Sequence, residues 1–541
     1  MSVTAFILSE FQQKRWFRLA ALAGLILWAI LLTGLFFSTQ PTTGLFTDNQ
    51  STYFVQGLRL SGQHPYLEND WFAQTKPLHI AFTWLVAGLT RLGVLAPAAR
   101  VLDVLFRLVF LLSLGLMTNA LLTLAIPEDN PDPLKRGGLV LSVISIYILS
   151  LWPVFQLSAI SEQLGISSLA IAFEKFGFYY SWGGFAAFRY YTEPASFSVL
   201  ILTAIALMPY KRWRWSAALL GIAGLMHASF LIHSGVIAGI LALYLFLRKE
   251  RKEALIVIGI YAFIVLPLVI YILTQMTDAQ SGTANLILAL ERVPHHTQPS
   301  RWWNSTDSVH LGVILVGSAV LWWKDRGPTR WTVLAITLYA GLSILLVLWM
   351  KDNASLAILM PWRASGYLYA VCQLVVLTAG LTLLINLLGR WPHFAVLITI
   401  IIPLVFLIWG AVENGIFSVL AEEYEDTTTQ ENYPFMLQIQ EKTPEDAVLL
   451  IPLNEGDYRL GAQRPIYVDW KSHPYKGEEV MEWWDRVNFV RNFYILGAPD
   501  RLQACHQAEA DFYVVTTGQH QPIEPATTSW GDWVLVPCPI P

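Results

Sequence analysis

Apolar runs of about twenty residues recur along this chain, and short connections rich in Lys and Arg join many of them. A helix rises about 1.5 Å per residue, so it needs a run of this length to cross the roughly 30 Å hydrocarbon core of a bilayer. The chain is therefore expected to be a polytopic α-helical membrane protein. We predict eleven membrane-spanning helices, at residues 17–38, 101–126, 137–154, 194–210, 215–230, 232–247, 254–274, 309–323, 331–350, 365–388 and 394–412.

The composition agrees with a chain that is largely surrounded by lipid. Hydrophobic residues make up 55% of the 541 residues and charged residues only 14%, against roughly 25% charged in a soluble domain. The 22 Trp residues point the same way, because Trp gathers where membrane meets water. A net charge of −4 gives no indication of a nucleic-acid partner.

The basic residues predict the orientation, because Lys and Arg concentrate in the cytoplasmic connections of membrane proteins. Lys14, Arg15 and Arg18 precede the first apolar run, and no cleavage site follows it, so we predict an uncleaved first span. The basic connections on the same side as the N-terminus are residues 135–136, 211–214, 248–252, 324–330 and 390. Eleven spans place the N-terminus inside and the tail outside, which suits a bacterial cytoplasmic (inner) membrane.

Two segments decide this orientation. Residues 77–96 are apolar enough for a span, but counting them would put the basic connections at 211–214 and 248–252 outside. We therefore predict that they form a helix on the outer membrane surface, where amphipathic segments with Trp and Arg often lie. Residues 215–247 form either two short helices broken near Met226 and His227 or one long bent helix, and only two helices preserve the orientation.

The predicted domains are a transmembrane part, residues 1–422, and a soluble tail, residues 423–541. Large loops face outward at residues 38–100, 152–193, 274–309 and 351–365. The tail is expected to be a small α/β domain outside the cytoplasm, with strands at 447–453, 465–470, 512–516 and 533–536 and a helix at 478–494. Cys505 and Cys538 either pair, if the tail lies in an oxidising compartment, or remain two free thiols.

Acidic residues gather at the outer ends of the predicted spans, while the interiors of spans 1, 3 and 7 to 11 carry none. A proton- or ion-coupled transporter would instead show acids or broken helices near the midplane. Asp48, about ten residues beyond the first span, is the leading candidate for chemistry. A carboxylate there can act as a general base or a metal ligand, or it can cap the helix expected after Ser51.

An ordered set of features in the first outward loop resembles the GT-C superfamily of membrane glycosyltransferases. The set is an acid outside span 1, the Lys76-Pro77-Leu78 opening of a surface helix that contains Trp84, and the approach to span 2 through residues 93–101. That superfamily includes lipid A aminoarabinose transferases and protein O-mannosyltransferases. Its members usually carry Asp-Glu where this chain has Asp48-Asn49, and Lys-Pro-Pro where it has Lys76-Pro77-Leu78. The clear resemblance covers about 80 residues.

The resemblance implies that an acceptor hydroxyl displaces the lipid phosphate of a polyprenyl-phosphate sugar, with inversion, at the outer membrane face. Asp48 would then be one catalytic acid, and the second-loop acid of the family maps best to Glu193. The candidates for the donor phosphate are Lys76, Arg189 and Arg363. Two of these candidates also have a purely structural alternative: Glu193 can stabilise a helix start, and Arg363 can anchor at the interface. A divalent metal is left open, since a lone Asp48 does not require one.

Three further residues are candidates for an acceptor or auxiliary role: His227, Asp469 and Lys471. Asp469 and Lys471 alternate with His473 along a strand-like segment that could line an acceptor groove or form a solvated strand end. The string Val468-Asp469-Trp470-Lys471 resembles that of uncharacterised bacterial multispanning proteins with a comparable tail. The expected partners are a polyprenyl-phosphate sugar, the lipid bilayer, and a glycan, lipid or protein acceptor.

Two other functions remain open from the sequence. The chain could be a transporter or lipid flippase, which the scarcity of acids in the spans disfavours. It could also be a non-catalytic membrane scaffold that displays the C-terminal domain to a partner.

Overall fold

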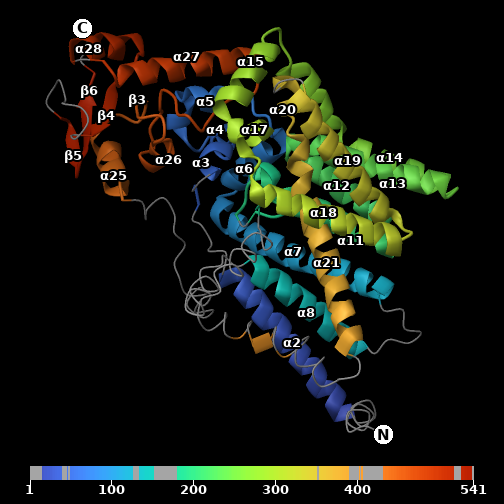
Figure 1. Cartoon of the computed structure of the whole chain (residues 1–541). Helices are drawn as coiled ribbons and strands as arrows, with labels where there is room; N and C mark the ends of the chain where they lie inside the picture. Colours follow the sequence, from blue (N-terminus) through green and yellow to red (C-terminus); the bar gives the residue numbers. More distant parts are fainter. Residues whose placement is uncertain are drawn as a thin grey trace, which may run out of the picture.

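The computed structural model describes residues 15–38, 45–46, 49–125, 133–151, 180–189, 191–349, 353–388, 431–496, 498–516 and 526–538, with 401, 404–405 and 408. Long apolar helices form one part of the molecule, and a small α/β domain formed by the tail caps one end of it (Figure 1). This confirms the predicted fold class. The described long helices are α2 (Arg15–Ser38), α7 (Leu95–Ala125), α8 (Pro133–Leu151), α11 (Ser198–Leu207), α12 (Trp213–Met226), α13 (Ala228–Leu247), α14 (Arg251–Tyr271), α18 (Ser305–Lys324), α19 (Pro328–Trp349) and α21 (Ser365–Leu387).

Six of the described helices are long and apolar enough to cross a membrane, so the chain is a multi-pass membrane protein. Four shorter apolar helices accompany them, and the predicted span at 394–412 lies almost wholly outside the described residues, so the count of eleven stays a prediction. The six segments are Leu95–Ala125, Ala228–Leu247, Arg251–Met276, Ser305–Lys324, Pro328–Leu346 and Ala354–Leu387.

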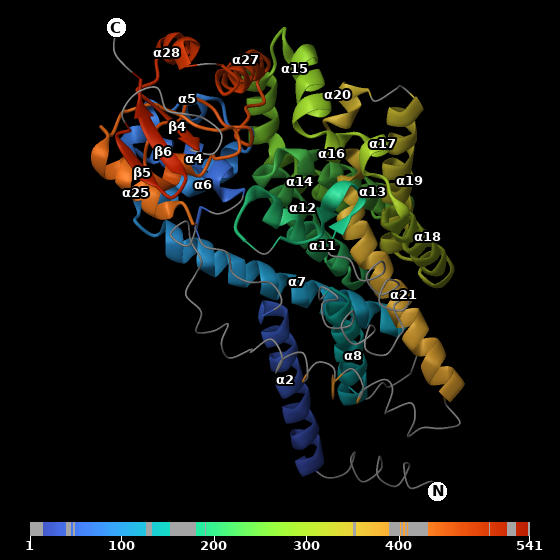
Figure 2. The same ribbon diagram turned by 60° about the vertical axis from the view of Figure 1, so that its left-hand side comes forward.

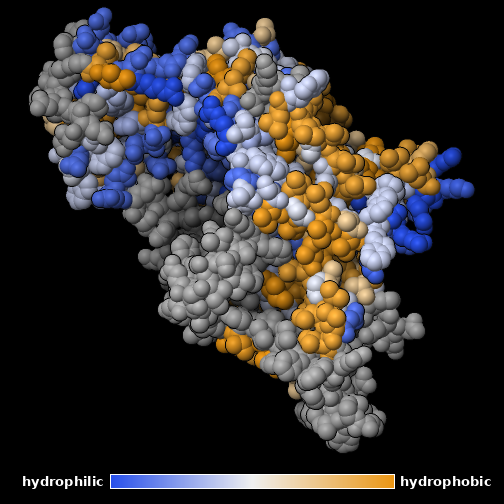
Figure 3. All heavy atoms as spheres, in the orientation of Figure 1, coloured by the Kyte–Doolittle hydropathy of each residue, from blue (hydrophilic) through white to orange (hydrophobic). Residues whose placement is uncertain are grey.

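The outer faces of these helices are apolar, as a lipid-facing surface requires. Phe263 of α14 is 81% exposed and Leu255 is 74% exposed, and Leu342 of α19 is 64% exposed. In Figure 3 the hydrophobic residues cover the side of the molecule that α14, α18 and α19 form. Hydrophilic residues gather at the tail and at the connection between α13 and α14. An apolar face of this extent is stable in lipid and unfavourable in water.

The predicted break between two short helices at 215–247 is confirmed. Helix α12 ends at Met226, and His227 adopts an extended backbone (φ −134°, ψ 111°) before α13 begins at Ala228. His227 occupies the N-cap of α13, where its Nδ1 accepts a hydrogen bond from the backbone N–H of Ser229 (3.2 Å). At 14 residues, α12 is shorter than the roughly 20 residues needed for a full span.

Side-chain contacts join three of the basic connections that were predicted to share one side. Arg136 donates to Asn119 Oδ1 (2.8 Å), and Asn119 donates to the Tyr210 hydroxyl (2.7 Å), which links connection 135–136 to the one at 211–214. Arg214 pairs with Glu253 (2.7 Å), which links 211–214 to 248–252. Helix α2 starts at the end of the molecule opposite the tail (Figure 2). These contacts are those expected if the basic connections share a membrane face.

The first outward loop folds into a compact helical layer instead of a further span. Helix α6, at 12 residues, is too short to cross a bilayer, which agrees with the surface helix predicted at 77–96. It packs so closely on α4 that a Cβ atom added at Gly57 would lie only 2.7 Å from Val86 Cβ. Only glycine fits at this contact. The elements of this loop are α3 (Gln50–Tyr53), α4 (Val55–Ser61), η1 (Pro65–Glu68), α5 (Trp71–Gln74) and α6 (Ile80–Arg91).

The remaining outward segments are short turns and helices around the same end of the molecule. From loops two to four they are β1 (Tyr180–Ser181), η2 (Trp182–Gly184), β2 (Phe185–Ala186), η3 (Pro194–Phe197), η5 (Ile272–Met276), α15 (Ser281–Ile287), η6 (Leu288–Arg292), α16 (Pro294–Thr297), α17 (Pro299–Trp302), α20 (Ala354–Ala357) and η7 (Pro361–Ala364). The opposite end carries the turn η4 (Met208–Tyr210).

The tail contains a four-stranded mixed sheet in the order β3-β4-β6-β5. Strand β3 pairs parallel with β4, and the other pairs are antiparallel, with Val514 opposite Leu535. Alternate residues of β4 face two cores: Tyr513 and Val515 pack with α27, and Val514 packs with α25. The elements are α25 (Tyr433–Lys442), β3 (Leu449–Leu450), α26 (Tyr458–Gly461), α27 (Gly477–Phe493), α28 (Ala498–Gln507), β4 (Phe512–Thr516), β5 (Thr528–Trp530) and β6 (Trp533–Pro537).

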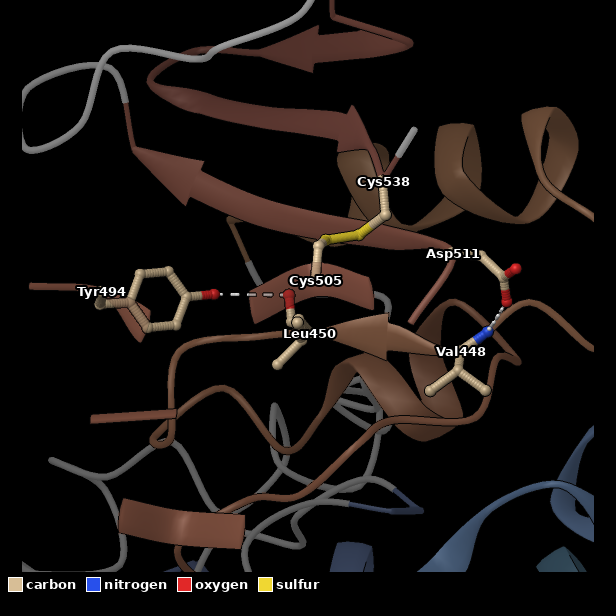
Figure 4. The surroundings of a disulfide bond; sticks show 6 residues. All are labelled: Val448, Leu450, Tyr494, Cys505, Asp511 and Cys538. Carbon is tan, nitrogen blue, oxygen red and sulfur yellow. Dashed lines mark hydrogen bonds between the residues drawn. A yellow bond between two sulfur atoms is a disulfide. The ribbon is translucent and has the colours of Figure 1, made fainter. Parts of the chain in front are cut away.

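The predicted strands at 512–516 and 533–536 and the helix at 478–494 match β4, β6 and α27. The strand expected at 465–470 is reduced to one parallel bridge between Leu449 and Ile466. The two tail cysteines form the disulfide Cys505–Cys538, with their Cα atoms 5.7 Å apart, so the paired alternative is the one found (Figure 4). This bond joins α28 to the residue that follows β6.

A buried ion cluster docks the tail on the first outward loop. Arg459 of α26 contacts Asp70 of the loop (2.8 Å) and Asp469 of the tail (2.9 Å), and all three side chains are at most 1% exposed. Asp70 also accepts a hydrogen bond from the backbone N–H of Ile466 (3.1 Å). Because a buried charge is costly without its partner, this cluster holds the two parts in one arrangement. The docked surface is where the candidate site lies.

Candidate functional site

A cavity of about 60 Å³ opens where the first outward loop, the third outward loop and the tail meet. Three of its lining side chains are cationic, and no carboxylate is among the described residues that line it. Such a volume suits a small charged group better than a whole sugar ring. The lining residues are Asn49, Thr52, Tyr53, Gln56, Phe72, Lys76, Leu78, His79, Thr83, Arg292, Lys471, His473, Pro474 and Tyr475.

Four aromatic rings form one wall of this cavity. Tyr53 and His79 of the first loop meet edge to face with centroids 5.3 Å apart, and His79 lies 6.3 Å from Tyr475 of the tail. Tyr475 in turn contacts His473 at 4.9 Å. Burial raises the pKa of both tyrosines. The phenols therefore stay protonated and can donate hydrogen bonds to an anion.

His79 is held as a neutral ring. The backbone N–H of Ala228 donates to its Nδ1 (3.2 Å), so the ring proton lies on Nε2. Burial, with the nearby charge of Arg363, lowers the pKa of His79 to about 3. A neutral His79 with an N–H at Nε2 is a hydrogen-bond donor, which suits a site for an anion.

Arg292 brings a cation from η6 to the cavity. Its Nη2 donates to the backbone carbonyl of Lys471 (3.2 Å), and its guanidinium lies 5.7 Å from the centroid of Trp470. Its Nε is buried and makes no hydrogen bond with a described residue. Burial lowers the pKa of Arg292. A guanidinium with an unused buried N–H group is the expected partner of a phosphate or carboxylate.

Arg363 and His227, both predicted site residues, are in contact behind His79. Arg363 Nη1 lies 3.2 Å from His227 Nε2 and also donates to the Ser229 hydroxyl. The guanidinium stacks over Phe185 at 4.4 Å. The His227 and His79 rings are 4.3 Å apart, which joins this pair to the cavity wall.

Glu193 and Arg189 form an ion pair in the second outward loop. Glu193 is fully buried, and its carboxylate lies 3.6 Å from Arg189 Nε. Glu193 also occupies the N-cap of η3, with Pro194 next to it, and its backbone N–H donates to the Ser196 hydroxyl (3.3 Å). The position therefore fits the start of a helix, as the structural alternative predicted. Burial, with the charges of Tyr475 and Glu193, raises the pKa of Tyr53.

Asp48 lies outside the described residues, but the residues that follow it are tied to the segment before Glu193. Asn49 donates to the Tyr191 hydroxyl (3.3 Å), and Gln50 donates to the backbone carbonyl of Thr192 (2.9 Å). Asn49 occupies the N-cap of α3, where the capping alternative would have placed Asp48. The segments that carry the two predicted catalytic acids therefore converge.

The predicted tail residues divide between two roles. Lys471 lines the cavity together with His473, as expected for a groove. Asp469 does not line it, because its carboxylate pairs with Arg459 and accepts the backbone N–H of Ser472 (2.6 Å). In this structure Asp469 serves the docking of the tail, and its auxiliary role stays a prediction. Lys76 of the first loop lines the same cavity as Lys471, 395 positions apart in the chain.

Sequence reasoning did not single out Tyr53, His79, Arg292 and Tyr475 as site residues. His79 directly follows Lys76-Pro77-Leu78, and Tyr53 lies four positions after Asn49 of Asp48-Asn49, so proximity to these motifs was the available signal. Arg292 and Tyr475 carry no such signal. Among the described residues, no three His, Cys, Asp or Glu side chains gather as metal ligands would. The divalent metal that the sequence left open is not tested.

The neutral histidines predict that acid destabilises the folded protein. His79 and His473 both have pKa values lowered from 6.5 to about 3, mainly by burial. Below pH 6.5 the unfolded chain binds protons that the folded chain excludes, so stability is present above this pH and is lost as the pH falls towards 3. Each histidine contributes about 1.4 kcal/mol per pH unit well below pH 6.5. Thermal unfolding in nanodiscs between pH 7.5 and 5 measures this loss.

His473→Gln is the matched variant, because it removes one of the buried histidines that titrate and keeps a polar side chain. We expect it to reduce the pH dependence of unfolding by about one proton. An unchanged slope would contradict the neutral, buried state of His473.

One family model matches the tail: residues 431–490 match a domain of unknown function (DUF6798). This segment contains Arg459 and Asp469 of the docking cluster and Lys471, His473 and Tyr475 of the cavity. The sequence matches no curated protein sequence.

Three solved structures are similar in shape at low sequence identity. The oligosaccharyltransferase of Archaeoglobus fulgidus, in complex with Zn and sulfate, is 11% identical over 91% of this chain and 68% of that one, with a TM-score of 0.46. ArnT from Cupriavidus metallidurans, bound to undecaprenyl phosphate, is 12% identical over 95% and 98%, with a TM-score of 0.45. AglB from A. fulgidus, with an inhibitory peptide and a dolichol-phosphate, is 11% identical over 93% and 70%, with a TM-score of 0.34. Likenesses at this level carry no argument about reaction or substrate.

Proposed function

We propose that this protein is a membrane glycosyltransferase that moves a sugar from a polyprenyl-phosphate donor to a hydroxyl acceptor. The observation that carries the proposal concerns Arg292 and Arg363. Both are partly buried near the same aromatic wall, and among the described residues no carboxylate lies within ion-pair distance of either. Uncompensated guanidinium groups in such a place favour an anionic ligand, and their planar fork matches phosphate oxygens.

The phosphate of the donor is the anion that best fits the position of this site. His79 of the cavity wall accepts the backbone N–H of Ala228, the first residue of the apolar helix α13, so the cavity adjoins the membrane helices and we expect a lipid-linked phosphate to reach it from the bilayer. Lys76 and Arg292 line the cavity, while Arg363 reaches it through His227 and His79. The Nε2 proton of His79 and the hydroxyls of Tyr53 and Tyr475 add neutral donors. Together these groups would stabilise the negative charge that develops on the leaving phosphate.

The reaction is a single displacement. The acceptor oxygen forms a bond to the anomeric carbon, and the bond from that carbon to the phosphate oxygen breaks. The bonding electron pair leaves with the phosphate, and the acceptor proton passes to a carboxylate, for which Asp48 is the first candidate and Glu193 the second. Attack from the face opposite the leaving group inverts the anomeric configuration. We place this reaction outside the cytoplasm, and the disulfide in the tail supports that side.

Arg363→Gln tests the proposal. Purified protein in lipid nanodiscs is offered a panel of polyprenyl-phosphate sugars, with cell-extract acceptors and divalent metal present or omitted, and free polyprenyl phosphate is followed by mass spectrometry. We expect release from at least one donor, and Arg363→Gln should lower it by about 10²–10³-fold, as loss of one charge-stabilising group does. Arg301→Gln is the matched control, because Arg301 is an exposed arginine in α17 of the neighbouring outward loop.

The other outcomes distinguish the rival functions. Release that Arg363→Gln leaves unchanged would place the donor phosphate elsewhere. No release from any donor, combined with movement of a lipid across vesicle membranes, would support a flippase. No release and no transport, with function lost on deletion of residues 423–541, would support a scaffold.

A further inference from the structure

A second, larger cavity of about 360 Å³ lies at the end of the membrane helices away from the tail. Helix α7 begins next to the first outward loop and reaches this cavity with its last turns, and α18 ends there as α19 begins. Pockets that hold small ligands measure roughly 300–1,000 Å³. Most of the lining is apolar, and its hydrophobic members include Met117, Ala120, Leu121, Leu124, Met208 and Leu321.

The polar groups of this cavity are few, and its charged lining residues are one lysine, Lys211, and one carboxylate, Asp325. Thr329 is 2% exposed, and its hydroxyl makes no hydrogen bond with a described residue. The carboxylate of Asp325 accepts the backbone N–H groups of Gly327 (2.6 Å) and Arg330 (3.2 Å), so it serves the start of α19. Lys211 stands at the rim next to the exposed Arg212, while Arg214 of the same connection pairs with Glu253. The rim is therefore basic, and a buried hydroxyl is left without a partner inside.

The surroundings place this cavity at a membrane–water boundary. Arg330 stacks on Trp322 (4.6 Å) and Trp331 (5.4 Å), and Lys324 lies over Trp323 (5.1 Å). Trp323 is 80% exposed. Tryptophan beside lysine and arginine at the ends of long apolar helices is typical of the interfacial layer.

We propose that this cavity binds an anionic phospholipid of the bilayer, with part of one acyl chain inside and the headgroup at the basic rim. The apolar lining suits an acyl chain, and the Thr329 hydroxyl can donate to an ester oxygen of the lipid. Lys211 faces the phosphate, and basic residues near a membrane surface favour anionic lipids. The site is independent of the proposed glycosyl transfer, because it lies at the opposite end of the helices from the first cavity.

The test is native mass spectrometry of the full chain released from nanodiscs that contain equal amounts of phosphatidylglycerol and phosphatidylcholine. We expect the wild-type protein to retain phosphatidylglycerol in preference to phosphatidylcholine. Lys211→Gln should lower this preference about fivefold. Ala120→Phe should displace the acyl chain and lower the retention of both lipids. Lys249→Gln is the matched control, since Lys249 is an exposed lysine of a neighbouring basic connection.

Thr329→Val keeps the shape of the side chain, removes only the hydroxyl, and should weaken retention even if Ala120→Phe fails to fold. Equal retention of the two lipids by the wild-type protein would overturn the proposal. The proposal would also be overturned if Lys211→Gln lost lipid retention while Ala120→Phe and Thr329→Val kept it. That pattern would mean that the lipid binds only to the basic surface and not in the cavity.

Discussion

Replacing Asp48 by Asn is expected to lower the rate of polyprenyl-phosphate release by about 10²–10⁴-fold, the contribution of a general base. The amide cannot accept the proton of the acceptor hydroxyl, while its size and polarity are conserved. The residues next to Asp48 support this role. Asn49 lines the cavity, and its amide donates to Tyr191, two positions before Glu193. Initial rates in nanodiscs, with a donor identified from the panel, provide the measurement.

Two comparisons make the result specific. Glu68→Gln is the control, because Glu68 is an exposed acid of the same loop that pairs with Arg59. Donor binding should survive in Asp48→Asn, since the phosphate is held by cations and not by this acid. If Glu193→Gln gives the large loss and Asp48→Asn does not, Glu193 is the base. If neither variant slows release, the assignment of the acids is wrong.

The second large effect concerns the docking of the tail. Arg459→Met should destabilise the folded protein by about 3–5 kcal/mol, because it leaves two buried carboxylates without their shared cation. Asp70 and Asp469 are at most 1% exposed, so water cannot replace the guanidinium. The tail residues that line the cavity, Lys471 to Tyr475, follow Asp469 directly in the chain. We therefore expect the same variant to reduce glycosyl transfer as well as stability.

Thermal unfolding in nanodiscs measures the loss of stability, and a crosslink measures the loss of docking. The hydroxyls of Thr52 and Ser472 lie 3.4 Å apart across the interface, so a cysteine at each position should crosslink in the parent protein and not with Arg459→Met. Arg214→Met is the control, because the 59% exposed Arg214 pairs with Glu253 away from the tail, and such a surface pair contributes little to stability.

Adding Asp70→Asn and Asp469→Asn to Arg459→Met should recover part of the stability, since the buried charges are then gone. Without such recovery, the loss would be due to packing around Arg459, which lies 5.4 Å from the ring of Phe72.

Much of this architecture could be predicted from local properties of the sequence. The apolar runs, the break near His227 and the short surface helix at α6 follow from side chains within a single segment. Strands β4 and β6 and helix α27 could be predicted for the same reason. The periodicity of hydrophobic residues that indicates each element lies within one short stretch of sequence. The strand expected at 465–470 failed, since its pairing depends on how a neighbouring segment lies and not on its own pattern.

The candidate site could be predicted only in part. Lys76, Arg363, His227, Glu193 and Lys471 all lie at or near the outer end, where the distribution of charged residues placed them. Which of them face one another could not be predicted. Asp469 was assigned to an acceptor groove because it alternates with Lys471, yet its carboxylate is used to bind Arg459.

The sequence by itself predicted that the chain spans a membrane many times, that its basic connections share a side, and that its polar chemistry lies near one end. Each of these follows from hydropathy and charge, which act on a segment wherever it sits. Only the tertiary structure decided that Asp70 meets Arg459 across 389 positions and that Arg292 meets Lys471 across 179. Contacts at such separations arise from the docking of folded parts, and no local pattern in the chain encodes them.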